Sequence, residues 1–430
     1  MMRKLENPDP ATWTELAKRP TKNFEELEAG IGQTFRMVQE QGDAALVKLA
    51  KKYDGVQLDR LLVTETEIAA AEAHIPAELK EAILQAYSNI QLFHAQQVEQ
   101  PKQVETMTGV TCWRKSVAIE KVGLYIPGGT APLFSTLLML GVPARLAGCR
   151  EIVLCTPPSK EGSVHPAILY TASLLGIDKV VKAGGAQAIA AMAFGTETVP
   201  AVNKIFGPGN QYVTVAKQLL SKTGVAIDLP AGPSEVLVIA DDSANPAFVA
   251  ADLLSQAEHG ADSQVVLLTN SSQLLEQVEA QLKTQLEALP RKEFAAMALQ
   301  NSLGILLKDV EEMIRFSNLY APEHLILSIN NFESVLEQIT NAGSVFLGNY
   351  SPESAGDYAS GTNHTLPTNG YARAYSGVSL DSFVKKITFQ YITPEGLQNI
   401  GKTIEVMAEA EGLEAHKNAV SIRLKEVTNV

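Results

Sequence analysis

The sequence predicts an α/β protein with two parallel, helix-covered sheets. From about Lys121 onward, short apolar runs alternate with stretches of 10–20 residues whose apolar positions recur at helical spacing. Such alternation is typical of parallel strands that are connected by helices. The number of runs favours two sheets over one, because a single sheet commonly has about four to six strands. The expected strands cover residues 122–126, 151–155, 179–183, 204–206, 236–240, 264–268, 304–307, 324–329 and 344–347.

The composition is that of a folded protein with large cores. Of the 430 residues, 46% are apolar and 19% are charged, and this charged share lies below the ~25% usual for soluble proteins. It predicts large cores or a wide subunit interface and excludes disorder as the main state. The length suggests about three domains. The net charge of −13, with no basic stripe, argues against nucleic acid or an anionic membrane as a partner.

Three features predict a soluble, cytoplasmic protein. Cys112, Cys149 and Cys155 are too few and too irregularly spaced for a disulfide scaffold, and the first ten residues lack the apolar core of a signal peptide. Residues 122–144 carry no charge and are long enough to span a bilayer. Prolines and glycines, Pro143 among them, break this stretch, so we expect a strand, a turn and a short helix there instead.

Helical segments flank the alternating region. The pattern from Asn23 to about Ile90 is helical. Near the C-terminus, Thr393 is placed to cap a helix whose first residue is a proline, and Gly412 separates this helix from a second one over residues 414 to about 425. An apolar stripe on such a tail must pack on the protein's own body or on a partner subunit. The stripe consists of Leu397, Ile400, Ile404 and Met407.

Four glycine turns border the expected strands, at residues 127–130, 183–187, 206–210 and 231–235. Glycine allows close backbone approach to a ligand, and ligands of open α/β sheets bind outside the carboxyl ends of the strands. Each turn alone could be an ordinary strand-to-helix connection, but four together favour the walls of one cleft. The common dinucleotide-binding fingerprint is absent, because Tyr212 stands where its third glycine belongs.

One candidate metal pair lies at the end of an expected helix over residues 245–260. Gln256 and His259 are three residues apart and therefore share one face of that helix. This spacing suits two ligands of one metal ion, and histidine is a common zinc ligand. Most such pairs bind nothing, so the spacing alone leaves a metal site and a plain surface pair both open.

A candidate acid/base pair follows Pro322. Glu323 and His324 stand at the entrance of an expected strand, where both side chains could face solvent at a sheet edge. A carboxylate beside an imidazole makes a usable acid/base pair near neutral pH. The alternative is an ordinary surface turn.

Residues 348–370 form a long expected loop that is rich in Gly, Ser, Thr, Asn and Pro. Loops of this length are usually functional or disordered. Its aromatic residues favour a binding loop, in which Asp357 and His364 are the candidate functional residues.

Glu411 and His416 lie at the break in the C-terminal tail. The remaining histidines are interpreted as structural or solvated: His74, His94 and His165.

Together these motifs resemble the histidinol dehydrogenase family over essentially the whole chain. The matching segments stand in the family's order, and none departs from it at a functional position. They are VGLYIPGGTAPLFSTLLM, GGAQAIAA, FGPGN, DLPAGPSEVLVIAD, DLLSQAEHG, LYAPEHL, SAGDYASGTNHTLPT and EGLEAHKNAVSIRL. The resemblance implies an NAD-dependent, two-step oxidation of L-histidinol to L-histidine through L-histidinal, the last step of histidine biosynthesis.

The resemblance also implies a role for each candidate residue. Glu323 and His324 would be the acid/base pair. One zinc ion per subunit would be bound by Gln256, His259, Asp357 and His416. Contacts with the substrate would come from Ser234, Gln256, His259, His324, Asp357, His364, Glu411 and His416. Contacts with NAD would come from Tyr125, Gln187 and Asn210.

The family's architecture implies a homodimer with intertwined tails, so that the neighbouring chain supplies Glu411 and His416. It also implies two Rossmann-like domains without the glycine fingerprint, plus a small helical C-terminal tail that packs on the partner. We expect residues 21–119 with 236–375 to form the first domain, with the metal and acid/base residues, and 120–235 the second, with the NAD loops. Two smaller parts complete the division: an accessory segment of 1–20 with 376–405, and a C-terminal arm of 406–430.

Three other functions stay open from the sequence. One of the three cysteines could bind an aldehyde covalently, although free cysteines are more often buried and inert. A zinc-dependent hydrolase without NAD could use Glu323 to activate a water molecule. A non-catalytic sugar- or amine-binding protein would need neither a reactive cysteine nor an activated water molecule.

Overall fold

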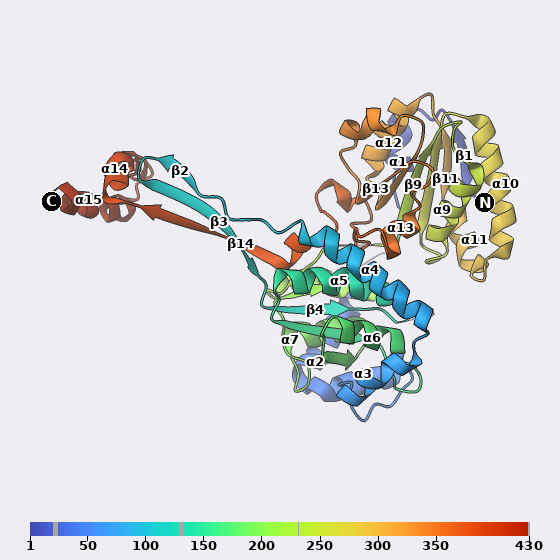
Figure 1. Ribbon diagram of the computed structural model, residues 1–430, viewed down its shortest axis with the longest axis horizontal. Coiled ribbons are helices and arrows are strands. Elements are labelled where there is room, and N and C mark those ends of the chain that lie inside the picture. Colours follow the sequence, from blue (N-terminus) through green and yellow to red (C-terminus); the bar gives the residue numbers. More distant parts are fainter. Residues whose placement is uncertain (20–24, 129–131, 231, 429–430) are drawn as a thin grey trace.

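The computed structural model describes residues 1–19, 25–128, 132–230 and 232–428. Two α/β lobes carry a long arm that projects away from both of them (Figure 1). All nine expected strands are present, with bounds within one residue of those expected. They were predictable because strands of parallel sheets are buried on both faces and therefore read as continuous apolar runs. The α/β class with two parallel sheets is confirmed.

The first lobe, here called the central lobe, is built on a five-stranded parallel sheet. Its strands are β4 (Lys121–Tyr125), β5 (Glu151–Thr156), β6 (Lys179–Lys182), β7 (Lys204–Phe206) and β8 (Ala226–Ile227). Its helices are α2 (Glu25–Tyr53), α3 (Glu65–Ala71), α4 (Ala77–Ala95), α5 (Phe134–Ala147), α6 (Pro166–Leu174), α7 (Gly185–Phe194) and α8 (Gln211–Leu219). Alternate residues of β4 face opposite layers: Leu124 belongs to the core with α5 and α6, and Tyr125 to the core with α2, α7 and α8.

The second lobe, here called the outer lobe, has a six-stranded parallel sheet. Its strands are β1 (Arg3–Glu6), β9 (Glu235–Ala240), β10 (Gln264–Thr269), β11 (Leu303–Leu306), β12 (His324–Ser328) and β13 (Ser344–Leu347). Its helices are α1 (Trp13–Leu16), α9 (Pro246–Ala257), α10 (Ser272–Ala288), α11 (Lys292–Gln300), α12 (Val310–Tyr320) and α13 (Glu353–Tyr358). Helices α9, α10 and α11 cover one face of the sheet, and α1 and α12 cover the other.

Both sheets have a switch point in their strand order. The orders are β6-β5-β4-β7-β8 and β1-β11-β10-β9-β12-β13, so the chain reverses its direction across the sheet between β4 and β7, and again between β9 and β12. Switch points of open α/β sheets form ligand crevices at the carboxyl ends of the strands. The central lobe follows that rule, because its glycine turns leave β4, β6 and β7 at their carboxyl ends.

The expected domain division was wrong in two places. Helices α2, α3 and α4 pack on the central lobe, against α7, α6 and α5 respectively, and belong to its cores rather than to those of residues 236–375. Residues 3–6 form β1, which pairs with β11 in the outer lobe, so the N-terminus does not join an accessory segment with 376–405. Such packing between distant segments leaves no local trace in an amphipathic pattern, which shows only that a helix has one buried face.

The projecting arm combines a three-stranded antiparallel sheet with two helices. Its elements are β2 (Val104–Met107), β3 (Val110–Ala118), β14 (Val384–Ile392), α14 (Pro394–Ala410) and α15 (Glu414–Thr428). The Thr393 side chain accepts a hydrogen bond from the backbone N–H of Gly396, as expected for the cap of α14, and Gly412 has a φ of 70° between the two helices. The expected boundary at residue 405 falls inside α14, so the arm is one unit and includes β14.

The uncharged stretch 122–144 forms β4 and most of α5, as expected. Pro143 does not end the helix, because it lies inside α5, whose left-handed C-cap is Gly148. Among the described residues, no helix combines the length and the apolar character that crossing a membrane requires.

Candidate active site

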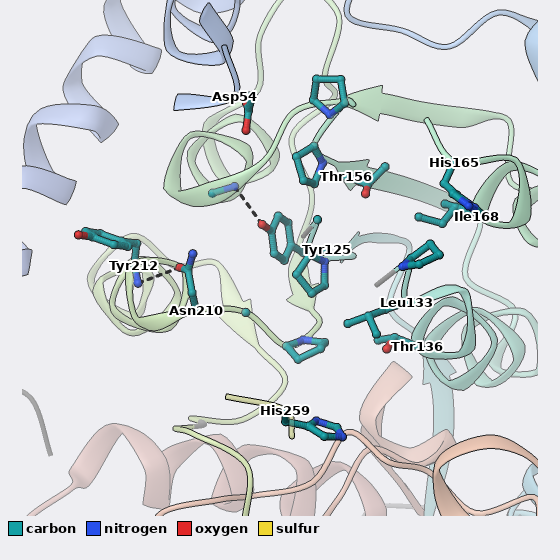
Figure 2. A pocket seen from close by; sticks show the side chains of 18 of the residues that line it. Asp54, Tyr125, Leu133, Thr136, Thr156, His165, Ile168, Asn210, Tyr212 and His259 are labelled. Atoms are coloured by element: carbon teal, nitrogen blue, oxygen red, sulfur yellow. Dashed lines mark hydrogen bonds between the residues drawn. The ribbon is translucent and has the colours of Figure 1, made fainter. Parts of the chain in front are cut away.

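A cavity of about 1530 Å³ lies between the two lobes. All four glycine turns contribute described residues to its wall, so their interpretation as parts of one cleft is confirmed. Ten of the predicted site residues line it: Tyr125, Gln187, Asn210, Ser234, Gln256, His259, Glu323, His324, Asp357 and His364. Figure 2 shows the side of the cavity that the central lobe forms, with His259 of the outer lobe below it.

The central lobe presents backbone groups and polar side chains to the cavity. The Tyr125 hydroxyl, at the end of β4, accepts a hydrogen bond from the N–H of Gly185 at 3.0 Å. Asn210 caps α8 by accepting hydrogen bonds from the N–H groups of Tyr212 and Val213 (Figure 2). Gly207 has a φ of 125°, and a Cβ there would overlap the carbonyl oxygen of Tyr125. This position therefore requires glycine.

The outer lobe faces the cavity with the amino ends of its strands. Glu323 and His324 enter β12, which lies between β9 and β13 and is not an edge strand. Both side chains are buried, with exposed fractions of 6% and 3%, so the expected solvent-facing position at a sheet edge was wrong. Ala321 has a φ of 54° and ends α12, which turns the chain directly into this pair. The ordinary rule for α/β sheets would not have pointed to this edge.

One residue of β9 contacts both members of the pair. The backbone N–H of Glu235 donates to Oε2 of Glu323 at 2.8 Å, and its carbonyl oxygen lies 3.1 Å from Nδ1 of His324. A carbonyl can only accept, so Nδ1 carries a proton, and Nε2 is the nitrogen at which the ring gains or loses its second proton. Within the described ranges this buried Nε2 has no hydrogen-bond partner, and the nearest carboxylate oxygen given for it is Oδ1 of Asp357, at 3.7 Å.

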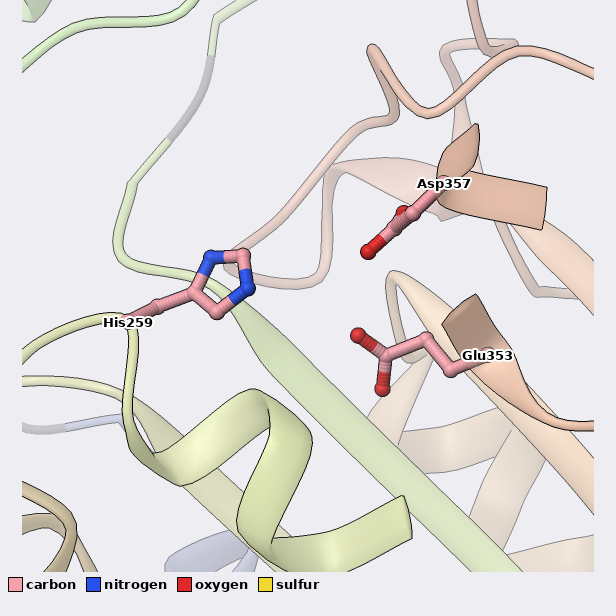
Figure 3. Close-up of side chains that lie close together, drawn as sticks. All are labelled: His259, Glu353 and Asp357. Carbon is pink, nitrogen blue, oxygen red and sulfur yellow. The ribbon is translucent and has the colours of Figure 1, made fainter. Parts of the chain in front are cut away.

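A second cluster of polar groups lies beside the pair. His259 follows α9, while Glu353 and Asp357 lie one turn apart on α13 (Figure 3). Each offers one ligand atom, and these atoms lie within 4.8 Å of one another. With its amide nitrogen turned toward Glu353, Gln256 donates to that carboxylate. One imidazole nitrogen with two carboxylates suits a divalent transition metal.

Two expectations about this cluster need correction. Residues 348–370 are not a loop throughout, because 353–358 form the short helix α13. Sequence reasoning also missed Glu353, which is fully buried. Its position four residues before Asp357 was a usable signal, because residues at that spacing share one face of a helix.

The buried charges shift one another's ionisation. Burial raises the pKa of Glu353 well above its usual range, and the neighbouring carboxylates add to this effect. Burial also acts to raise the pKa of Asp357, but His324, His364 and His259 outweigh it and leave that pKa lowered. Burial acts to lower the pKa of His324, but Glu323 and Glu353 outweigh it and leave that pKa raised. The site therefore has an excess of carboxylates in a space that a cation would neutralise.

Glu411 and His416 do not line the cavity of their own chain. Glu411 ends α14 and His416 lies on α15, both exposed at the far end of the arm (Figure 1).

The three cysteines do not line the cavity either. Cys149 and Cys155 are buried, which raises the pKa of their thiols to about 11 and about 12, and Cys112 lies on the arm. Such thiols are poor nucleophiles, so the covalent alternative finds no support.

These features define the class: a two-lobed α/β protein whose cleft holds a buried carboxylate–imidazole pair beside a candidate metal cluster. The family model of histidinol dehydrogenase matches residues 17–424, and the chain belongs to the histidinol dehydrogenase family.

Known members of the family are similar to it along nearly their whole length. The histidinol dehydrogenase of Bacteroides thetaiotaomicron is 61% identical over 424 residues, which cover 99% of each chain. The chloroplastic enzyme of Arabidopsis thaliana is 53% identical over 415 residues, covering 96% of this chain and 89% of that one. The crystal structure of histidinol dehydrogenase from Elizabethkingia anophelis matches with a TM-score of 0.98 and 60% identity over 99% of both chains. Nothing in these comparisons supports the hydrolase alternative.

Proposed function

We propose that this protein is an L-histidinol dehydrogenase, which oxidises L-histidinol to L-histidine through L-histidinal and reduces two NAD. It would catalyse the last step of histidine biosynthesis, in the cytoplasm. The observation that carries the proposal is that the buried Glu323–His324 pair lines one cavity together with His259 and Asp357, two members of the candidate metal cluster. Relatives named histidinol dehydrogenase, similar over nearly the full chain, support the same assignment.

The donor groups fit one zinc ion per subunit. Gln256, His259 and Asp357 would hold it together with His416 of a second copy, and buried Glu353 lies within reach of the same space. Histidinol offers an imidazole and an amine, both good nitrogen donors, so bound zinc would orient the substrate. The substrate ammonium must lose its proton to bind in this way, so activity should rise with pH.

In this proposal His324 accepts protons during both oxidations. Its Nδ1 donates to the Glu235 carbonyl, so Nε2, once deprotonated, would take the alcohol proton as hydride leaves the carbon. The aldehyde must then add water, because a second hydride can leave only from the hydrate. Glu323 is suited to activate this water as a general base. His324 would accept a proton again in the second oxidation, and the reactive aldehyde should stay in the cleft between the two steps.

NAD would occupy the central-lobe side of the cavity. Tyr125, Gln187 and Asn210 lie at the glycine turns after β4, β6 and β7 and all line it. NAD would supply the hydride acceptor. The turn at Gly207 lies against the backbone of Tyr125, and Pro208, Gly209 and Asn210, which follow it, line the cavity.

The arm supports a homodimer with shared sites. It carries exposed apolar side chains on both its sheet and its helices, including Tyr391, Val406, Met407 and Ile422. Exposed apolar groups in such number mark an interaction surface. In this proposal each arm reaches the cleft of the other chain and delivers Glu411 and His416 there, since neither residue reaches the cleft of its own chain.

Absorbance of NADH at 340 nm tests the function. Purified protein with histidinol and NAD should produce NADH, lose this activity on chelation and regain it when zinc returns. Circular dichroism should show that the chelated protein stays folded, because the cores of both lobes are large and contain none of the proposed ligands. A zinc hydrolase would produce no NADH, and a binding protein would be unaffected by Glu323→Gln.

A further inference from the structure

The backbone that holds the acid/base pair is itself fixed by a buried ion pair. Glu235 contacts both members of the pair through its N–H and C=O groups. Its side-chain carboxylate accepts two hydrogen bonds from Arg19, at 3.0 Å from Nε and 2.8 Å from Nη2, and a third from the N–H of Asn369 at 2.6 Å. The exposed fractions are 7% for the Arg19 side chain and 1% for that of Glu235. Bidentate guanidinium–carboxylate pairs fix orientation as well as distance.

Arg19 also holds the turn that leads into the pair. Its guanidinium stacks on the ring of Tyr320, with Cζ 3.5 Å from the ring centroid, and Nη2 donates to the carbonyl oxygen of Ala321 at 3.4 Å. Ala321 has the positive φ that turns the chain toward Glu323. A non-glycine residue keeps such a conformation only where its surroundings fix it. One side chain thus contacts both β9, through Glu235, and the turn that leads into β12.

We propose that Arg19 is a positioning residue for histidinol oxidation: through Glu235 and the turn at Ala321 it fixes the two catalytic groups, Glu323 and His324. The inference rests on the proposed function. A lysine could not replace it fully, because an ammonium neither forms the planar two-bond pair nor stacks in the same way. Without Arg19, the buried Glu235 carboxylate would lose its cationic partner and keep the backbone N–H of Asn369.

Three variants test the proposal by their steady-state kinetics: Arg19→Gln, Arg19→Lys and the double variant Arg19→Gln/Glu235→Gln. Displacement of catalytic groups by about 1 Å can cost ~100-fold in rate. We expect Arg19→Gln to lower kcat by about 10- to 100-fold with little change in the KM for histidinol. The kcat of Arg19→Lys should lie between that of Arg19→Gln and that of the wild type. The double variant should recover part of the loss, because it leaves no Glu235 carboxylate without its cationic partner.

The two oxidations give a second readout. Because Glu235 contacts both Glu323 and His324, Arg19→Gln should slow oxidation of histidinol and of histidinal alike. Leu282→Ala is the matched control, since it opens the core of the same lobe on α10, away from the cavity. It should lower the melting temperature and leave kcat unchanged.

Unchanged kcat per folded Arg19→Gln enzyme would overturn the proposal, as would a change confined to KM or no recovery in the double variant. If Arg19→Gln does not fold, the kinetics of Arg19→Lys test the proposal instead, and a wild-type kcat in that variant would overturn it. These outcomes differ from failure of the proposed function, in which the wild-type protein itself would form no NADH.

Discussion

His364 and Thr136 join the two lobes across the cleft. Nε2 of His364, in the segment after α13, lies 3.0 Å from Oγ1 of Thr136 on α5, and Nδ1 lies 2.9 Å from the carbonyl oxygen of Asp357. Since that carbonyl only accepts, the neutral ring donates from Nδ1 and accepts the threonine hydroxyl proton at Nε2. Burial lowers the pKa of His364, which favours this neutral form.

Loss of this bridge should weaken substrate binding. Thr136→Val removes the hydroxyl and keeps the shape, and a hydrogen bond of this kind contributes about 0.5–1.5 kcal/mol. We expect the KM for histidinol to rise by about 2- to 10-fold. Thr136→Ser, which retains the hydroxyl, should stay close to the wild type. Equal KM values for the valine and serine variants would show that the bridge does not support binding.

The acid/base pair should divide its work unequally between the two oxidations. His324→Asn removes the proton acceptor of both steps, so each should slow by about 100- to 10,000-fold. Glu323→Gln should slow mainly the oxidation of histidinal, because only this step needs an activated water. Single-turnover measurements with histidinol and with histidinal separate the steps. Equal losses in both steps for Glu323→Gln would contradict the division.

The strands and the helix caps were predictable because each leaves a local mark, whereas the roles of the site residues come from the family resemblance. A buried parallel strand reads as an apolar run, and a helix cap such as Asn245 or Thr393 reads as a polar residue before proline. The use of the amino edge of the outer sheet left no such mark. It depends on how the two lobes face each other, whereas the packing of α2 on the central lobe depends on contacts between distant segments of one lobe. Glu353 was missed because residues 348–370 were expected to form a loop, so its spacing from Asp357 was not interpreted as one face of a helix.

Sites shared between chains should allow two inactive variants to complement each other. His259→Ala disables the cleft of its own chain, whereas His416→Ala should disable the cleft of the neighbour. In a heterodimer of the two, one site carries both changes and the other carries neither. Random exchange in a two-fold dimer should therefore restore about one quarter of the wild-type activity. Heterodimers isolated with two different affinity tags that remained inactive would contradict the shared site.

His94 should make folding sensitive to acid without taking part in catalysis. It is fully buried on α4, where Nδ1 lies 2.9 Å from the carbonyl oxygen of Ile90 and, among the residues described, Nε2 has no partner. Burial lowers the pKa of its imidazole below the ordinary 6.5, and the Ile90 contact only partly opposes this. Below pH 6.5 the unfolded chain therefore binds a proton that the folded one does not. Stability should be full above pH 6.5 and fall below it, by at most about 1.4 kcal/mol per pH unit for one group.

Urea unfolding between pH 5 and pH 7.5 measures this contribution. The difference in midpoint between the two pH values should be smaller for His94→Gln than for the wild type, because the variant has no proton to gain at this position. His74→Gln is the matched control: its ring makes the same contact, with the carbonyl oxygen of Ala70 at 3.0 Å, but it is exposed. Removing it should leave the pH dependence as in the wild type. Parallel pH profiles for the wild type and His94→Gln would show that protonation of other groups causes the loss of stability in acid.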